Sequence, residues 1–177
     1  TASENSFKES IEILNNYPDP YNNLGTILII KGDYEEAKKM FKTAIRINPK
    51  FSQAYYNLAN SYKQTNQFKL AIQTYEKTIL TNPLFYQALN NLGVLYKDIG
   101  DLKSSVDYLK RAIKCKPDYI DAINNLGISL KLLGKNDEAV LSFKKVIKIE
   151  QKNKEALNNL AIMKYEKGEN EKAINDF

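Results

Sequence analysis

The sequence predicts an all-α fold of tandem helix-turn-helix repeats, each 34 residues long and stacked into an α-solenoid. The first observation is a triplet, Asn-Leu-Gly or Asn-Leu-Ala, that recurs every 34 residues and begins at Asn23, Asn57, Asn91, Asn125 and Asn159. The second is a residue that readily ends a helix, found at the same spacing at Gly32, Asn66, Gly100, Gly134 and Gly168. A fixed period without insertions or deletions indicates one supersecondary unit that was copied and stacked.

Each repeat is expected to begin with a helix that carries the triplet and ends at the glycine or asparagine. These first helices are predicted over residues 19–31, 52–65, 86–99, 120–133 and 154–167. A second helix should follow directly, and the second helices are predicted over residues 34–47, 68–81, 102–115, 136–149 and, incompletely, 170–177. Pro49, Pro83 and Pro117 mark the exit of the second helix in three repeats, because proline cannot continue a helix.

The sequence is expected to begin inside a repeat. Phe7, Ile11 and Leu14 share one face of a predicted helix, and Phe7 and Ile11 precede Phe41 and Ile45 by one period. The whole chain, residues 1–177, is therefore predicted to be a single array. It comprises the second helix of a truncated repeat at 3–17, full repeats at 18–51, 52–85, 86–119 and 120–153, and a truncated repeat at 154–177.

Small residues recur at one position of each helix, which predicts that the two helices of a repeat approach closely. They are Gly25, Ala59, Gly93, Gly127 and Ala161 on the first helices, and Ala37, Ala71, Ser105, Ala139 and Ala173 on the second helices. An aromatic column precedes the first helices at Tyr17, Phe51, Phe85 and Tyr119. We expect these aromatic residues to pack in the core and between repeats rather than to bind a ligand.

Composition excludes several classes of function. The sequence is 43% hydrophobic and 27% charged, and its apolar runs are too short to span a bilayer, so no membrane segment is expected. The absence of histidine removes the commonest general base and metal ligand, and no catalytic motif, metal site or cofactor is expected. The net charge of +5 is modest, which argues against nucleic-acid binding. Cys115 is the lone cysteine and favours a reducing compartment, the cytoplasm or nucleus.

The repeats resemble tetratricopeptide repeats over nearly the whole chain. In the first full repeat the signature residues are Tyr21, Leu24, Gly25, Leu28, Ala37, Phe41, Ala44 and Pro49. The resemblance implies a right-handed superhelix whose first helices line a concave groove, where an extended protein segment binds. Gln151, Asn153 and Lys164 depart from the pattern, so we expect a looser junction in the last repeat.

The asparagine of the triplet is not explained by packing alone. Asparagine costs roughly 0.6 kcal/mol against alanine inside a helix, so the Asn column (Asn23, Asn57, Asn91, Asn125 and Asn159) costs on the order of 3 kcal/mol in propensity. A primary amide complements the N–H and C=O of a peptide bond, so the column could hold an extended chain by its backbone. The alternative is that duplication copied an inter-helix hydrogen bond, or merely an asparagine.

Other polar residues extend the predicted groove. Further amides lie next to the Asn column or one turn away at Asn22, Asn60, Asn90, Asn124 and Asn158. A second column with the same spacing consists of Lys63, Lys97 and Lys131. These lysines could select acidic residues of a ligand, although a solvated row is the commoner arrangement.

The Asn column is similar to the ladder in the tetratricopeptide arm of O-linked N-acetylglucosamine transferases. That resemblance implies that the column holds substrate backbones for a separate catalytic domain. The clamp that captures chaperone C-termini is not expected, because the positions where it needs lysine hold Asn22, Tyr56, Asn90, Asn124 and Asn158. The predicted function is therefore a non-catalytic protein-interaction module that binds an extended peptide. The alternative is a scaffold that self-assembles or organises a complex.

Overall fold

The computed structural model describes residues 16–166 and 168, and the regular secondary structure of this part of the chain is helical. The helices are α2 (Pro18–Ile30), α3 (Tyr34–Ile47), α4 (Ser52–Gln64), α5 (Phe68–Thr81), α6 (Tyr86–Asp98), α7 (Leu102–Cys115), α8 (Ile120–Leu132), α9 (Asn136–Ile149) and α10 (Lys154–Glu166). The complete second helices have the predicted bounds, and each first helix ends one residue earlier than predicted. The helices predicted at 3–14 and 170–177 lie outside the described residues.

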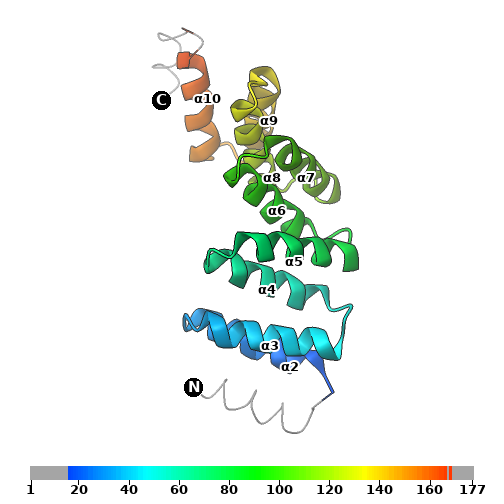
Figure 1. Ribbon diagram of the computed structural model, residues 1–177. Helices are drawn as coiled ribbons and strands as arrows, with labels where there is room; N and C mark the ends of the chain where they lie inside the picture. The colour runs from blue at the N-terminus through cyan, green and yellow to red at the C-terminus, as the bar shows by residue number, and fades with distance from the viewer. Residues whose placement is uncertain (1–15, 167, 169–177) are drawn as a thin grey trace. The chain divides into compact units, whose positions relative to one another are not determined.

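The chain divides into two compact units, residues 1–88 and 89–177. In the first unit, α2 packs against α3, α4 packs against α5, and both α2 and α3 contact α4. In the second unit, α8 contacts both α7 and α9, and α9 contacts α10. Each unit is thus a stack of helical hairpins joined by short turns (Figure 1), which confirms the all-α helical-repeat prediction.

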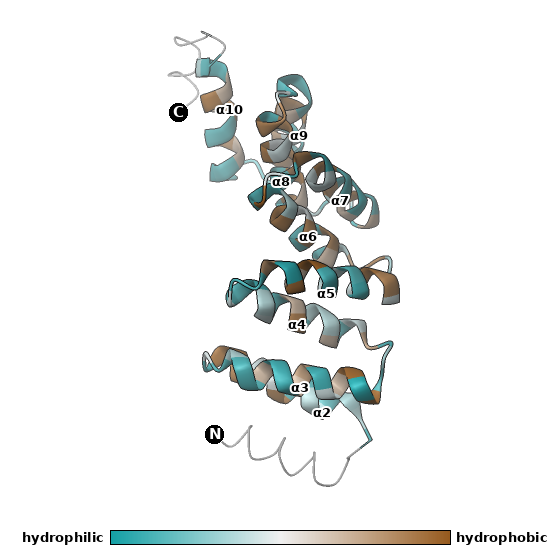
Figure 2. Ribbon diagram, viewed as in Figure 1, coloured by the Kyte–Doolittle hydropathy of each residue, from teal (hydrophilic) through white to brown (hydrophobic). Residues whose placement is uncertain are grey.

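The core of each unit lies inside and between the hairpins. Hydrophilic and hydrophobic residues alternate along the helices, as expected when only one side of a helix is buried (Figure 2). Large side chains with no exposed surface stand at one register of the second helices, at Phe41, Tyr75, Leu109 and Phe143. Burial at all four described copies of this register shows that each of these hairpins rebuilds the same core.

The predicted helix ends are confirmed by backbone conformation. Positive φ angles occur at Gly32, Asn66, Gly100, Gly134 and Gly168, with Asn66 the exception to glycine at φ 57°. A Cβ atom added at Gly32 would meet nothing within 4 Å. Glycine is therefore favoured there by its φ of 82° and not by space, because other residues pay a steric cost in this region.

The triplet glycines have the opposite reason to be small. A Cβ atom on Gly25 would lie 2.5 Å from Cε1 of Phe41, and one on Gly127 would lie 2.6 Å from Cε1 of Phe143. On Gly93 it would lie 2.7 Å from Cγ of Leu109. The predicted close approach of the two helices of a repeat is thus confirmed in these hairpins.

Two aspartates begin second helices by capping them. Asp33 accepts a hydrogen bond from the backbone N–H of Glu36 at 3.3 Å, and Asp101 accepts one from that of Ser104 at 3.1 Å. The Ser104 hydroxyl also donates to Asp101 at 2.7 Å. These bonds favour the charged carboxylate, with the hydroxyl contributing most, and so lower the pKa of Asp101.

The aromatic column is less buried than predicted at its first member. Phe51, Phe85 and Tyr119 are half-buried, whereas Tyr17 exposes 57% of its surface. Asn153, which breaks the column, has another use. Its Oδ1 accepts a hydrogen bond from the backbone N–H of Ala156 at 3.0 Å and so caps the start of α10. This departure therefore exchanges an aromatic contact for a helix cap.

Candidate peptide-binding site

The Asn column lies on the first helices of both units, from α2 to α10. Asn23 is exposed, and Asn57, Asn91, Asn125 and Asn159 are half-buried. The residues one position earlier differ among themselves. Asn22, Asn90 and Asn124 are buried, whereas Asn158 is exposed. The buried asparagines are therefore better placed to bond within the protein, and the column residues retain surface for a ligand.

In the first unit, an amide–amide hydrogen bond joins neighbouring first helices. Nδ2 of Asn57 on α4 donates to Oδ1 of Asn22 on α2 at 2.9 Å. Oδ1 of Asn57 accepts from Nε2 of Gln53, one turn earlier, at 3.1 Å. The amide of Asn57 is therefore held in one orientation from both ends.

The second unit repeats this bond at the same register. Nδ2 of Asn125 on α8 donates to Oδ1 of Asn90 on α6 at 3.1 Å. Nδ2 of Asn90 in turn donates to Oδ1 of Asn91 at 3.2 Å. A column residue thus bonds the buried asparagine of the preceding repeat in both units. An inter-helix hydrogen bond was the alternative to ligand binding that the sequence analysis considered for the column, and Asn57 and Asn125 make such a bond.

The bond is absent at the next copy of this register. Oδ1 of Asn124 is buried and accepts no hydrogen bond within the described part of the chain, although Asn159 occupies the equivalent column position. Nδ2 of Asn124 instead donates to Oε2 of Glu155 at 3.2 Å. The carboxylate at the start of α10 therefore holds the NH2 group of the buried amide, while its oxygen receives no donor from the column. The triplet pattern alone could not show this, because Glu155 lies outside it.

Asn60, predicted to bind peptide, serves the core of its own repeat. The hydroxyl of the fully buried Tyr75 donates to Oδ1 of Asn60 at 2.5 Å. The corresponding residues of the preceding repeat are Thr26 and Phe41, and Oγ1 of Thr26 donates to the backbone carbonyl of Asn22 at 3.0 Å. The repeat whose core aromatic residue has a hydroxyl, Tyr75, therefore also has an amide that accepts its hydrogen bond, whereas the repeat with Phe41 has a threonine at that position.

We expect Asn60→Thr and Tyr75→Phe to be strongly non-additive. Asn60→Thr leaves a buried phenol without its acceptor, which should lower the free energy of unfolding by about 1–3 kcal/mol. The double variant restores the Thr26 and Phe41 pairing and should cost less than the sum of the two single changes. Urea unfolding of the four proteins measures the coupling. Additive losses would show that the hydroxyl–amide bond does not stabilise the repeat.

The lysine column is half-buried and largely paired. Nζ of Lys131 lies 2.9 Å from Oε1 of Glu166 on the next first helix, and Nζ of Lys97 lies 3.4 Å from Oδ1 of Asp98. Lys63 makes no ion pair with the described residues. Of this column, Lys63 is therefore the cation with most freedom to meet an acidic ligand.

The described residues include no group of three His, Cys, Asp or Glu side chains that could hold a metal ion. None of the helices described here is both long and apolar enough to cross a membrane. The first helices carry a column of neutral amides and a column of lysines, beside carboxylates such as Asp98 and Glu166. The amides offer donors and acceptors that suit hydrogen bonding to a polypeptide.

Comparison with known proteins assigns the class of the fold. Family models described as tetratricopeptide repeat match residues 28–92, residues 86–119, and residues 6–39 and 108–140. Together they span residues 6–140, and the chain therefore belongs to the tetratricopeptide repeat proteins. Tetratricopeptide repeats are non-catalytic interaction modules. No curated protein sequence matches the chain.

Solved structures agree on the fold. YrrB, described as a tetratricopeptide repeat protein with an unusual peptide-binding site, is 24% identical with a TM-score of 0.81, covering 96% of this chain and 88% of its own. MamA is 24% identical with a TM-score of 0.76, covering 84% of this chain and 87% of its own. PilF of Pseudomonas aeruginosa is 23% identical with a TM-score of 0.80, covering 90% of this chain and 72% of its own.

Proposed function

We propose that this protein binds an extended segment of a partner protein against its first helices, with the Asn column holding the partner's backbone. One observation carries the proposal. The same amide–amide bond, from Asn57 to Asn22 and from Asn125 to Asn90, orients column residues in both units. The similarity in fold to YrrB, whose description includes a peptide-binding site, supports a peptide ligand.

The inter-helix bonds leave the column able to bind. A primary amide has two N–H donors, and Asn57 and Asn125 each donate one of them to the preceding repeat. The second N–H is left for the carbonyl of a ligand. Because the amides are already oriented, a ligand pays less side-chain entropy on binding. Such contacts recognise backbone and therefore select extended segments with little regard to sequence.

The test uses several unrelated peptides selected from a random library for binding to the full chain. Asn91→Ala/Asn125→Ala should weaken all of them by roughly tenfold, because each lost hydrogen bond contributes about 0.5–1.5 kcal/mol. Asn23→Ala is the sharper single change, because Asn23 makes no hydrogen bond in the described structure that its loss would break. Asn136→Ala, an exposed asparagine on the second helix α9, is the matched control.

Unchanged peptide affinity in the Asn23 and Asn91/Asn125 variants would contradict the proposal and leave the column a structural feature.

A scaffold that self-assembles is the second candidate, favoured by apolar side chains of α10. Leu157, Ile162 and Tyr165 are 39%, 38% and 65% exposed. Sedimentation equilibrium of the same samples decides between the two. The scaffold would be favoured if the protein formed oligomers as its concentration rose and these oligomers did not bind the selected peptides.

A place in the substrate-recruiting arm of an O-linked N-acetylglucosamine transferase stays a prediction from the Asn column alone. Peptide binding does not require it, because the same amides would hold a backbone in any array. We likewise propose a non-catalytic role for this chain. A cytoplasmic or nuclear location stays a prediction from the single cysteine.

A further inference from the structure

A pocket of about 290 Å³ lies in the first unit, between side chains of α3, α4 and the start of α5. Its lining includes Lys38, Lys39, Lys42, Glu35, Tyr62 and Gln67. Tyr62 is five residues after Asn57 on α4, so it points to a different side of that helix from the Asn column. The pocket is therefore separate from the proposed peptide-binding face.

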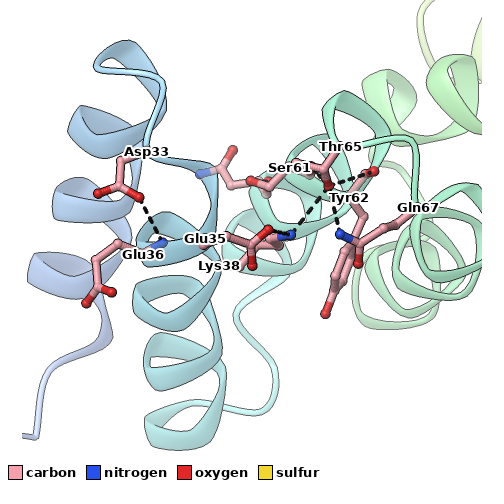
Figure 3. Close-up of polar contacts among 9 residues, drawn as sticks. Asp33, Glu35, Glu36, Lys38, Ser61, Tyr62, Thr65 and Gln67 are labelled. Atoms are coloured by element: carbon pink, nitrogen blue, oxygen red, sulfur yellow. Dashed lines mark hydrogen bonds and ion pairs between the residues drawn. The ribbon is translucent and has the colours of Figure 1, made fainter.

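Lys38 is a buried cation at a position where other repeats are apolar. It exposes 4% of its surface, and the equivalent residues one, two and three periods later are Ile72, Val106 and Val140. Its Nζ donates to Oε1 of Glu35 at 2.6 Å and to Oγ1 of Thr65 at 3.4 Å, as Figure 3 shows. An unpaired ammonium would be expensive to bury, and these two acceptors hold it in place.

A second ammonium group converges on the same pocket wall. Nζ of Lys38 lies 5.4 Å from the centroid of the Tyr62 ring, and Nζ of Lys42 lies 5.8 Å from it. Lys42 makes no ion pair with the described residues, whereas Lys39 pairs with Glu36 at 2.8 Å. Two cations near one ring repel each other. The carboxylate of Glu35 pairs with Lys38 and not with Lys42, and its side chain is 75% exposed.

We propose that this pocket binds a carboxylate from an acidic segment of a partner protein. The incoming carboxylate would lie between Lys42 and Lys38 and relieve the repulsion of their ammonium groups. The desolvation cost of Lys38 is already met in the folded chain, so an anion there gains charge-assisted hydrogen bonds with little further loss. Because Glu35 is exposed, its side chain can turn toward water when the ligand enters.

The geometry also favours a carboxylate over a bulky anion. Figure 3 shows Glu35 and Lys38 of α3 pointing toward Thr65 and Tyr62 of the neighbouring repeat. Nε2 of Gln67 donates to Oγ1 of Thr65 at 3.1 Å, which leaves its second N–H for another acceptor. An Asp or Glu side chain offers two acceptor oxygens on a slim stem, which suits an opening between packed helices.

The experiment titrates the full chain with N-acetylated, C-amidated pentaglutamate at low ionic strength and follows the Tyr62 ring by NMR. Lys38→Ile supplies the residue of the equivalent position 72, and Lys42→Met keeps the stem while removing the charge. We expect affinity to fall about tenfold in the first, because a buried charge-assisted bond is lost. In the second we expect a loss of about threefold, as for a more exposed pair.

Lys50→Met is the control for net charge, because Lys50 is exposed after α3 and does not line the pocket. It should bind pentaglutamate with nearly the affinity of the unmodified chain, and capped pentaglutamine should leave the Tyr62 signals in place. Equal affinities for Lys38→Ile, Lys42→Met and Lys50→Met would overturn the pocket. Tighter binding of inorganic phosphate than of pentaglutamate would overturn its assignment to carboxylates.

Discussion

Gly127→Ala is expected to lower the free energy of unfolding by about 1–3 kcal/mol, the usual cost of overpacking a core. The new Cβ atom would lie 2.6 Å from Cε1 and 2.7 Å from Cζ of Phe143. Phe143 has no exposed surface, so its ring cannot move aside into solvent. The helices α8 and α9 must then separate or the ring must leave its preferred rotamer.

The sign of this change is what makes the test sharp. Inside a helix, Gly→Ala ordinarily stabilises by about 0.5–1 kcal/mol, because glycine loses more backbone freedom on folding. A loss of stability therefore shows that the steric contact outweighs the gain in helix propensity. Urea unfolding measures the difference. A Gly127→Ala variant at least as stable as the unmodified chain would contradict the close approach of α8 and α9.

Ala59→Gly is the matched control in the first unit, where the triplet carries alanine opposite Tyr75. We expect it to destabilise by about 1 kcal/mol from propensity alone. The two substitutions run in opposite chemical directions, yet both should lower stability. Each hairpin is therefore expected to be fitted to its own small residue rather than to a shared consensus.

Lys38→Ile is expected to raise the free energy of unfolding by about 1–2 kcal/mol, since apolar replacements of buried ion pairs are often neutral or stabilising. The amine is buried against Thr65 and Tyr62, and Ile72 fills the same register one repeat later. The expected gain in stability is small because Glu35, the partner in the ion pair, is largely exposed and already solvated.

Glu35→Ala provides the contrast, because it removes the partner and leaves the buried ammonium group. We expect this variant to be clearly less stable than the unmodified chain, whereas Lys38→Ile is more stable. Thermal or urea unfolding of the two variants checks the order. If Lys38→Ile were the less stable of the two, the buried lysine would stabilise the packing of neighbouring repeats. It would then not be a destabilising residue that is kept for ligand binding.

Much of the fold could be predicted because the period supplied independent copies of each signal. The second helices have the predicted bounds, and the left-handed residues that end the first helices stand at the predicted positions from Gly32 to Gly168. The prediction was wrong where a residue was judged by its column alone. Tyr17 is exposed, although it stands in the predicted aromatic column, because local surroundings and not the register decide burial. Asn153, which breaks that column, caps α10, a role that the sequence analysis did not assign.

The candidate site was less predictable because periodicity fixes the face of a side chain but not its partner. The sequence placed Asn57 and Asn60 together on one helix. In the tertiary structure, Asn57 donates a hydrogen bond to Asn22 of the preceding repeat, and Asn60 accepts one from the hydroxyl of Tyr75. The pocket at Lys38 was missed, although one signal was present. A lysine stands there at a position that is apolar in later repeats.

The sequence by itself determined the repeat, its helices and the close packing of small residues against large ones. These depend on local propensity and on spacing along one chain. Only the tertiary structure decided which amides bond between repeats, why Oδ1 of Asn124 has no donor among the described residues, and where a buried cation meets a pocket. Those outcomes depend on side chains from different repeats meeting within about 3 Å, a distance that sequence spacing does not specify.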